Sequence, residues 1–216
     1  MTLRQELETL MSSRPARYQA MMEELATRLR RTALEGVLKT GDMMPDFVLP
    51  TSNGALLFAG DLLAEGPLVV VFFRGGWCPF CKATLTALND ILPEIEATGA
   101  NLVAILPDNG DHAVLTAQSL GLRYPVLTDL DGATAMEFGV LHRVPDALQA
   151  FMIAAGVDLA TWHGDPAWLL PMPATFVADR DGVLRYAYAS GSITDRMEPT
   201  EIVALLREMA GQTAVV

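Results

Sequence analysis

PLVVVFFRGGWCPFCK, residues 67–82, joins an apolar run to the only two cysteines of the chain. Residues 67–73 have the length and composition of a buried β-strand. The segment from Lys82 to about Glu96 has helical periodicity, and its apolar stripe consists of Leu85, Leu88, Leu92 and Ile95. Both thiols are therefore predicted to lie where a strand passes into a helix, in the first turn of that helix.

The first turn of a helix changes the chemistry of a thiol. Its backbone N–H groups are unpaired and the helix dipole is positive there, so the pKa of a thiol falls below the free value of about 8.5. Cys78 is predicted at or next to the N-cap, and Pro79 suits the first helical position, where no N–H is needed. Cys81 can reach Cys78 to close a disulfide and is expected to be the more enclosed sulfur. On this basis Cys78 attacks and Cys81 resolves; the alternative is a pair of structural cysteines.

The composition is that of a soluble globular protein, with 216 residues of which 51% are hydrophobic and 19% charged. A formal charge of −11 disfavours binding to nucleic acid or to an anionic membrane surface. The N-terminus lacks a secretion-signal pattern, and no uncharged apolar stretch reaches the roughly 18 residues of a membrane span. We therefore expect a cytoplasmic protein, in which a neighbouring cysteine pair is typically catalytic or redox-sensing.

Residues 1–40 are predicted to form an N-terminal helical extension. Apolar residues at helical spacing indicate one amphipathic helix over residues 2–12 and a second over about residues 15–38. Ser13, with Pro15 just beyond it, is a natural break between them. The extension either packs on the main domain or forms a homodimer contact, and the pattern leaves both open.

Residues 41–216 are predicted to form the main domain, in which strands alternate with helices. Expected strands cover residues 47–49, 55–58, 67–73, 101–106, 124–127, 174–178 and 183–188, and further helices cover about 111–120, 133–138 and 199–210. This order predicts an α/β sandwich around one mixed sheet. Residues 142–172 fit least well and are interpreted as an insertion, either a functional lid or packed filler.

Several motifs resemble a known family. A Cys-x-x-Cys pair at the start of a helix, a later proline before a strand, and a closing hairpin and helix are similar to the thioredoxin fold. GDMMPDFVL (residues 41–49), FFRGGWCPFCK (72–82) and LPMPATFVAD (170–179) resemble the peroxiredoxin-like branch of the alkyl hydroperoxide reductase/thiol-specific antioxidant (AhpC/TSA) family. The resemblance implies a thioredoxin-like sandwich, with a mixed central sheet flanked by helices, over nearly the whole chain.

The resemblance also implies parts of a site. Pro173 would be a cis-proline that packs against the disulfide, and Thr175 of the same motif would support it. One place departs from the family. Typical members carry Pro-x-x-x-Thr-x-x-Cys around the peroxide-attacking cysteine, whereas Val71 and Gly75 stand at those places relative to Cys78. The hydroxyl that would orient a peroxide is therefore missing.

Two reactions fit the pair. In the first, the Cys78 thiolate attacks a hydroperoxide, the sulfenic acid condenses with Cys81, and an external thiol of thioredoxin or glutathione type reduces the disulfide. Arg74 would favour the thiolate and the developing charge on the leaving oxygen, and Trp77 would wall the site. In the second, the pair exchanges directly with disulfides, as its glutaredoxin-like Pro79–Phe80 spacer allows. A non-enzymatic redox sensor is the third interpretation.

Other polar residues are interpreted as structural, and no cofactor is expected. A closed zinc site needs four ligands and two cysteines supply only two, so no metal is expected. The three histidines, His112, His142 and His163, stand at no ligand spacing, although the last two flank the insertion. Asp195 and Arg196 are expected to cap a helix or to form a surface ion pair, and the alternative for Arg196 is an arginine that faces the site.

Overall fold

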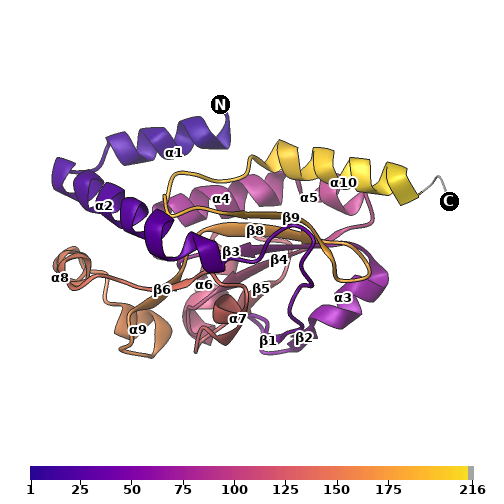
Figure 1. Cartoon of the computed structure of the whole chain (residues 1–216). Coiled ribbons are helices and arrows are strands. Elements are labelled where there is room, and N and C mark those ends of the chain that lie inside the picture. The colour runs from indigo at the N-terminus through magenta and orange to yellow at the C-terminus, as the bar shows by residue number, and fades with distance from the viewer. Residues whose placement is uncertain (214–216) are drawn as a thin grey trace.

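A five-stranded mixed sheet lies at the centre of the structure (Figure 1), a computed structural model that describes residues 1–213 and the side chains of residues 1–211. The strands are β1 (Val48–Pro50), β2 (Leu56–Phe58), β3 (Leu68–Phe72), β4 (Asn101–Leu106), β5 (Val126–Thr128), β6 (Leu141–Arg143), β7 (Leu169–Pro171), β8 (Ala174–Ala178) and β9 (Leu184–Ala189). The order in the sheet is β5–β4–β3–β8–β9, with β3 parallel to β4 and antiparallel to β8. The predicted mixed sheet is confirmed.

Helices cover both faces of this sheet. They are α1 (Leu3–Ser12), α2 (Ala16–Thr32), the 3₁₀ turn η1 (Leu34–Gly36), α3 (Ala59–Glu65), α4 (Pro79–Asp90), α5 (Leu92–Glu96), α6 (Gly110–Ser119), α7 (Ala133–Glu137), α8 (Asp146–Ala154), α9 (Leu159–His163) and α10 (Pro199–Thr213). Figure 1 shows α4, α5 and α10 on one face, and α3 and α7 on the other. Within the described residues, no helix combines the length and the apolar character needed to cross a bilayer.

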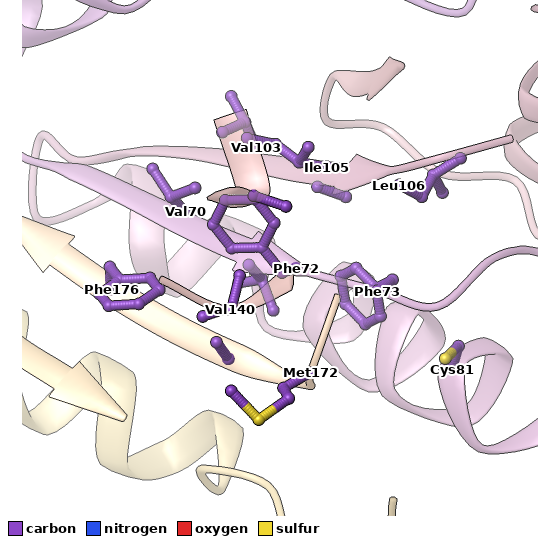
Figure 2. Packing of buried hydrophobic residues seen from close by; sticks show 14 of the residues in the cluster. Val70, Phe72, Phe73, Cys81, Val103, Ile105, Leu106, Val140, Met172 and Phe176 are labelled. Atoms are coloured by element: carbon purple, nitrogen blue, oxygen red, sulfur yellow. The ribbon is translucent and has the colours of Figure 1, made fainter. Parts of the chain in front are cut away.

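The central strand β3 holds the site in place. All five of its residues are buried, because helices cover the sheet from both sides. The Phe72 ring packs 5.0 Å from that of Phe138 and 6.0 Å from that of Phe176. Figure 2 shows part of this cluster, with Cys81 on α4 beside it, and Cys81 belongs to the same buried core. The turn that follows β3 therefore starts from a rigid position.

The N-terminal extension packs on the rest of the chain. Helix α1 lies along α4, with Leu3 and Leu7 buried. The Glu198 carboxylate, just before α10, accepts hydrogen bonds from the N–H groups of Leu3 (3.2 Å) and Arg4 (2.8 Å). The first N–H groups of a helix have no partner within the helix, so they favour an anionic group such as this carboxylate. The packed interpretation of the extension is confirmed, while the domain boundary at residue 40 stays a prediction.

Three element boundaries differ from the sequence-based expectation. The helix expected over residues 82–96 is two helices, which meet at Ile91 because Pro93 removes a backbone donor and does not continue the first helix. The second helix of the extension ends at Thr32 and passes into the 3₁₀ turn. Helix α3 was not expected; Gly60 in its first turn weakens the local helical signal.

The insertion over residues 142–172 is ordered in the structure. It begins and ends in the antiparallel pair β6–β7, where His142 lies opposite Leu170. Between these strands it carries α8 and α9, with Leu148, Met152 and Leu159 in the core. The insertion is therefore a small packed unit, as the tryptophan content of this segment suggests.

Candidate active site

Both cysteines lie where the sequence predicts, at the junction of β3 and α4. Cys78 is the N-cap of α4, with extended backbone angles (φ −89°, ψ 116°), Pro79 is the first helical residue, and Cys81 follows within the first turn. Their thiols are free. Cys81 was expected to be more buried than Cys78, and this is wrong, because Cys78 is 1% exposed and Cys81 0%. The extension and the insertion both pack near this end of α4, so burial does not separate the two roles.

A two-glycine turn brings Cys78 to the N-cap. Gly75 has φ +135°, a conformation that residues with a Cβ rarely adopt. A Cβ on Gly76 would lie 1.8 Å from Oγ1 of Thr116 in α6, so only glycine fits there. The Gly76 N–H donates a 2.7 Å hydrogen bond to Oδ2 of Asp108, which is fully buried. The turn is therefore fixed on both sides before the chain enters α4.

Arg74 is buried beside the thiols and is not a solvated loop arginine. It is 1% exposed, and its Nε and Nη1 atoms have no hydrogen-bond partner. Its guanidinium lies 5.0 Å from the ring of half-buried Trp77, and it also interacts with the Tyr18 hydroxyl of α2. Burial disfavours the Arg74 charge, but the interactions with Cys78, Tyr18 and Cys81 together outweigh burial and raise the pKa of Arg74. Arg74 and Cys78 thus stabilise each other's charged forms.

A second buried arginine, Arg196, lies on the loop between β9 and α10. Its expected role in a surface ion pair is wrong: it is 7% exposed, and its Nη1 donates to the carbonyl oxygens of Ser192 (3.3 Å) and Asp195 (3.1 Å). Burial lowers the pKa of Arg196, and the thiols of Cys81 and Cys78 oppose that effect. Among the described residues, neither Arg74 nor Arg196 forms an ion pair with a carboxylate.

The two thiols differ in acidity. Burial alone would raise the pKa of Cys78, but a hydrogen bond from the Cys81 thiol and the charge of Arg74 lower it to about 6. The Cys81 backbone and Arg196 add smaller contributions in the same direction. For Cys81, burial and the neighbouring Cys78 both raise the pKa well above its usual value. The arrangement therefore provides one thiolate and one thiol at neutral pH.

A buried acid lies behind the glycine turn. Burial raises the pKa of Asp108 to about 7, although the Gly76 N–H works against this. Its Oδ1 has no hydrogen-bond partner and lies 3.8 Å from Nε2 of His163, which is also unpartnered. Burial lowers the pKa of His163 to about 4, so the imidazole is neutral at pH 7. His163 and Asp108 form a polar cluster beside Trp77, and neither was expected in the site.

The expectation for Pro173 is wrong in one respect. Within residues 1–213 no peptide bond is cis, so Pro173 follows Met172 through a trans bond. Met172 N–H donates to the Val140 carbonyl (2.7 Å), and Ser190 N–H donates to the Pro173 carbonyl (3.1 Å), so both sides of the proline are held in extended chain. Thr175 is buried in β8, opposite Val71 of β3.

A buried cysteine pair at the start of α4, on a thioredoxin-like sheet, defines a thiol-dependent oxidoreductase. The family described as AhpC/TSA matches residues 40–187, and the chain belongs to that family. It is 27% identical over 175 residues to alkyl hydroperoxide reductase E of Mycobacterium tuberculosis, covering 79% of this chain and 99% of the relative. It is also 32% identical over 103 residues to the putative peroxiredoxin Rv1608c of the same species, covering 48% and 67%.

Solved structures support the same fold. The crystal structure of peroxidoxin BcpB from Mycobacterium tuberculosis matches with a TM-score of 0.64 and 26% identity, covering 80% of this chain and 98% of that one. The thioredoxin-like sandwich is therefore confirmed. A thiol-disulfide oxidoreductase, ResA of Bacillus cereus, is 24% identical over 149 residues, 68% of each chain.

Sequence reasoning missed two residues near the thiols, Asp108 and Tyr18, and one of them carried a signal. Asp108 follows β4, which is parallel to β3, and the carboxyl ends of neighbouring parallel strands meet at one edge of a sheet. The loop after β4 was therefore a candidate from the element order alone. Tyr18 lies far from Cys78 in sequence, on the extension, and no local pattern points from it to the thiols. Arg196 was only an alternative, because no local pattern shows which way it faces.

Proposed function

We propose that this protein reduces hydroperoxides through the Cys78 thiolate, with Cys81 as the resolving thiol. The observation that carries the proposal is the buried Cys78 sulfur beside Arg74, whose charge and the Cys81 hydrogen bond lower the pKa of Cys78 to about 6. At pH 7 such a thiol is mostly ionised, and the thiolate is the nucleophilic form.

The chemical steps use only these groups and an external thiol. The Cys78 thiolate attacks the outer oxygen of the hydroperoxide, a sulfur–oxygen bond forms, the O–O bond breaks, and the leaving oxygen takes a proton to become an alcohol or water. The unpartnered N–H groups of Arg74 would stabilise the charge on that oxygen. The Cys81 thiol then displaces water from the sulfenic acid to form the disulfide, and two equivalents of external thiol restore both thiols.

Burial favours a small oxidant. With 1% of Cys78 exposed, a protein disulfide would need the surrounding loops to open before its sulfur met the thiolate, whereas a hydroperoxide is small enough to enter. Arg74 also supplies donors that the missing threonine hydroxyl would otherwise provide. Arg74 therefore takes the place of the threonine hydroxyl that is missing at Gly75.

Thiol–disulfide exchange is the second candidate. The Cys-x-x-Cys spacing favours it, and so does the similarity to ResA. Reduction of insulin disulfides or of a glutathione mixed disulfide, without peroxide turnover, would support this candidate instead. The identity of the thiol donor, a cytoplasmic location and a homodimer stay predictions.

The test is hydrogen peroxide consumption with dithiothreitol as reductant. With dithiothreitol we expect turnover by the native protein and none by Cys78→Ser. With the reductant left out, we expect a single turnover by Cys81→Ser that stops with a sulfenic acid on Cys78, identified by mass spectrometry. A Cys78→Ser protein that consumes peroxide at the native rate would rule out the proposal.

A further inference from the structure

A cavity of about 280 Å³ opens beside the thiols, between the N-terminal extension and the insertion. Trp77 and Pro79, the two neighbours of Cys78 in sequence, line it together with Arg74. Helices α2 and α8 supply further lining residues, Tyr18 from α2 and Phe151 and Met152 from α8. The volume is close to the lower end of the roughly 300–1,000 Å³ typical of small-molecule sites. Hydrogen peroxide needs no cavity of this size.

The walls of the cavity are largely apolar. Phe151 and Met152 of α8, with Val157 just after it, line one side. Tyr18 of α2 lines the other, and its ring lies 5.7 Å from that of Phe151. Such a surface favours an apolar organic group over a peptide-like polar one, because polar atoms placed against it would lose their hydrogen bonds to water.

The charged groups at the cavity are all positive. Arg74 and Arg14 line it, and the Arg14 Nε is buried without a hydrogen-bond partner. The Arg17 guanidinium lies 6.0 Å from the Phe151 ring, so it adds positive charge near the same wall. Among the side chains of residues 1–211 no acidic one lines the cavity, in a chain whose formal charge is −11. This local reversal of sign favours an anionic ligand.

We infer that the cavity binds an organic hydroperoxide with an apolar body and a carboxylate. The hydroperoxide group reaches Cys78 beside Arg74, the apolar body lies against Phe151, and the carboxylate pairs with Arg14. This inference rests on the proposed peroxidase function and adds the chemical class of its preferred substrate. It also gives the insertion and the extension a role, since each supplies one wall.

The experiment compares two substrates with the same apolar body and different ends, a carboxylate and an uncharged ester: the hydroperoxide of a medium-chain fatty acid and its methyl ester, both below their aggregation limits. Stopped-flow oxidation of Cys78 gives a second-order constant for each. We expect the acid to react about tenfold faster than the ester, because a hydrogen bond between charged groups contributes roughly that much. Arg14→Met should bring the ratio close to one.

Two variants separate this reading from a general loss of structure. Arg30, on helix α2 that follows Arg14, is exposed and paired with Glu23, so Arg30→Met should keep the native acid-to-ester ratio. Phe151→Ala should slow both organic substrates relative to hydrogen peroxide, because both place an apolar body against that ring. Thermal melting of each variant verifies folding.

The outcomes are distinct. Fast oxidation by hydrogen peroxide with equal constants for acid and ester, unchanged by Arg14→Met, would overturn the inference and leave the peroxidase function standing. Oxidation by every hydroperoxide at the rate of free cysteine would overturn the function itself, and the inference with it. Protection of Cys78 from alkylation by decanoate, but not by methyl decanoate, is the expected binding result independent of turnover.

Discussion

At the scale of single residues, the acidity of Cys78 comes mainly from two side chains. The sequence predicts an N-cap thiolate stabilised by the helix backbone. In the structure the Cys81 thiol and Arg74 each lower the pKa of Cys78 more than the backbone does, and with the backbone and Arg196 they outweigh the cost of burial. A buried cation next to a thiol is a strong perturbation because the local dielectric is low.

Replacement of Arg74 tests this cause. Arg74→Met removes the charge but keeps much of the side-chain volume, and we expect the pKa of Cys78 to rise by about one to three units. The pH dependence of Cys78 alkylation measures it. Arg207→Met, at an exposed arginine paired with Glu94, is the matched control and should leave the pKa unchanged. An unchanged midpoint in Arg74→Met would contradict the assigned cause.

The buried carboxyl of Asp108 should make the free energy of unfolding depend on pH. Burial raises its pKa from 3.8 to about 7. The folded protein therefore binds a proton that the unfolded chain has released, so this carboxyl stabilises at low pH and its contribution is lost as pH rises to about 7. In Asp108→Asn the carboxyl is absent, so this loss of stability with rising pH does not occur. The free energy of unfolding of the variant, relative to native, should increase by a few kcal/mol, on the order of three to four, between about pH 4 and pH 7.

Denaturant unfolding across this pH range is the measurement for Asp108. Exposed Asp90 provides a control, since Asp90→Asn should give a flat difference. A flat difference for Asp108→Asn as well would show that the carboxyl is ionised throughout and that its environment is more polar than the structure indicates.

Residue-level prediction from the sequence succeeded where the signal was local. Cys78, Pro79 and Cys81 follow from spacing and from the helix start, and Arg74 from its place at the end of a strand. Arg196 lies more than a hundred residues away and reaches the thiols only through the tertiary fold. Its sequence neighbours resemble an ordinary surface turn.

At the scale of elements, strands and long helices were predictable and their interruptions were less so. Buried strands such as β3 and β4 are short apolar runs bounded by polar or glycine-rich segments. The break between α4 and α5 depends on Pro93. The apolar stripe continues past this proline, so the sequence pattern predicted one helix where the structure has two. Helix α3 is short, and tertiary packing rather than propensity holds it.

The contact between α1 and α4 supports a prediction at this scale. Leu7 is fully buried, so Leu7→Ala should lower the free energy of unfolding by about 2–5 kcal/mol, the range for removal of a buried leucine side chain. Leu56→Ala, at a position 62% exposed, should change it by less than about 0.5 kcal/mol. Chemical denaturation measures both. Equal effects would mean that the extension does not pack on the body in solution.

At the scale of the whole molecule, an acidic protein contains a positive interior site. Arg74 and Arg196 are both buried, and both interact with the two thiols, of which Cys78 is the ionised one at neutral pH. Formation of a Cys78–Cys81 disulfide would remove the Cys78 thiolate and leave both arginines without an anionic partner among the described residues. A protein of this kind stabilises its reduced form, which makes its disulfide more oxidising.

We therefore expect the melting temperature to differ between the reduced and the oxidised protein. The pKa of Cys78 falls from 9.0 to about 6 in the folded protein, so the thiolate stabilises fully above about pH 9 and this stabilisation is lost as pH falls through 6. Reduced protein should melt above oxidised protein at pH 9, with a smaller gap at pH 5.5, since so short a disulfide loop adds little. The double variant Cys78→Ser, Cys81→Ser should show no gap. A more stable oxidised form at pH 9 would contradict the prediction.

The most direct measurement is the pH dependence of single-turnover oxidation of Cys78 by hydrogen peroxide, followed by stopped-flow fluorescence of neighbouring Trp77. The second-order constant should rise through a midpoint near pH 6 and exceed that of free cysteine at pH 7. Cys81→Ser should still be oxidised once at Cys78. A midpoint between about pH 8 and 9, where a free thiol ionises, or a rate that survives Cys78→Ser, would contradict a buried thiolate as the attacking group.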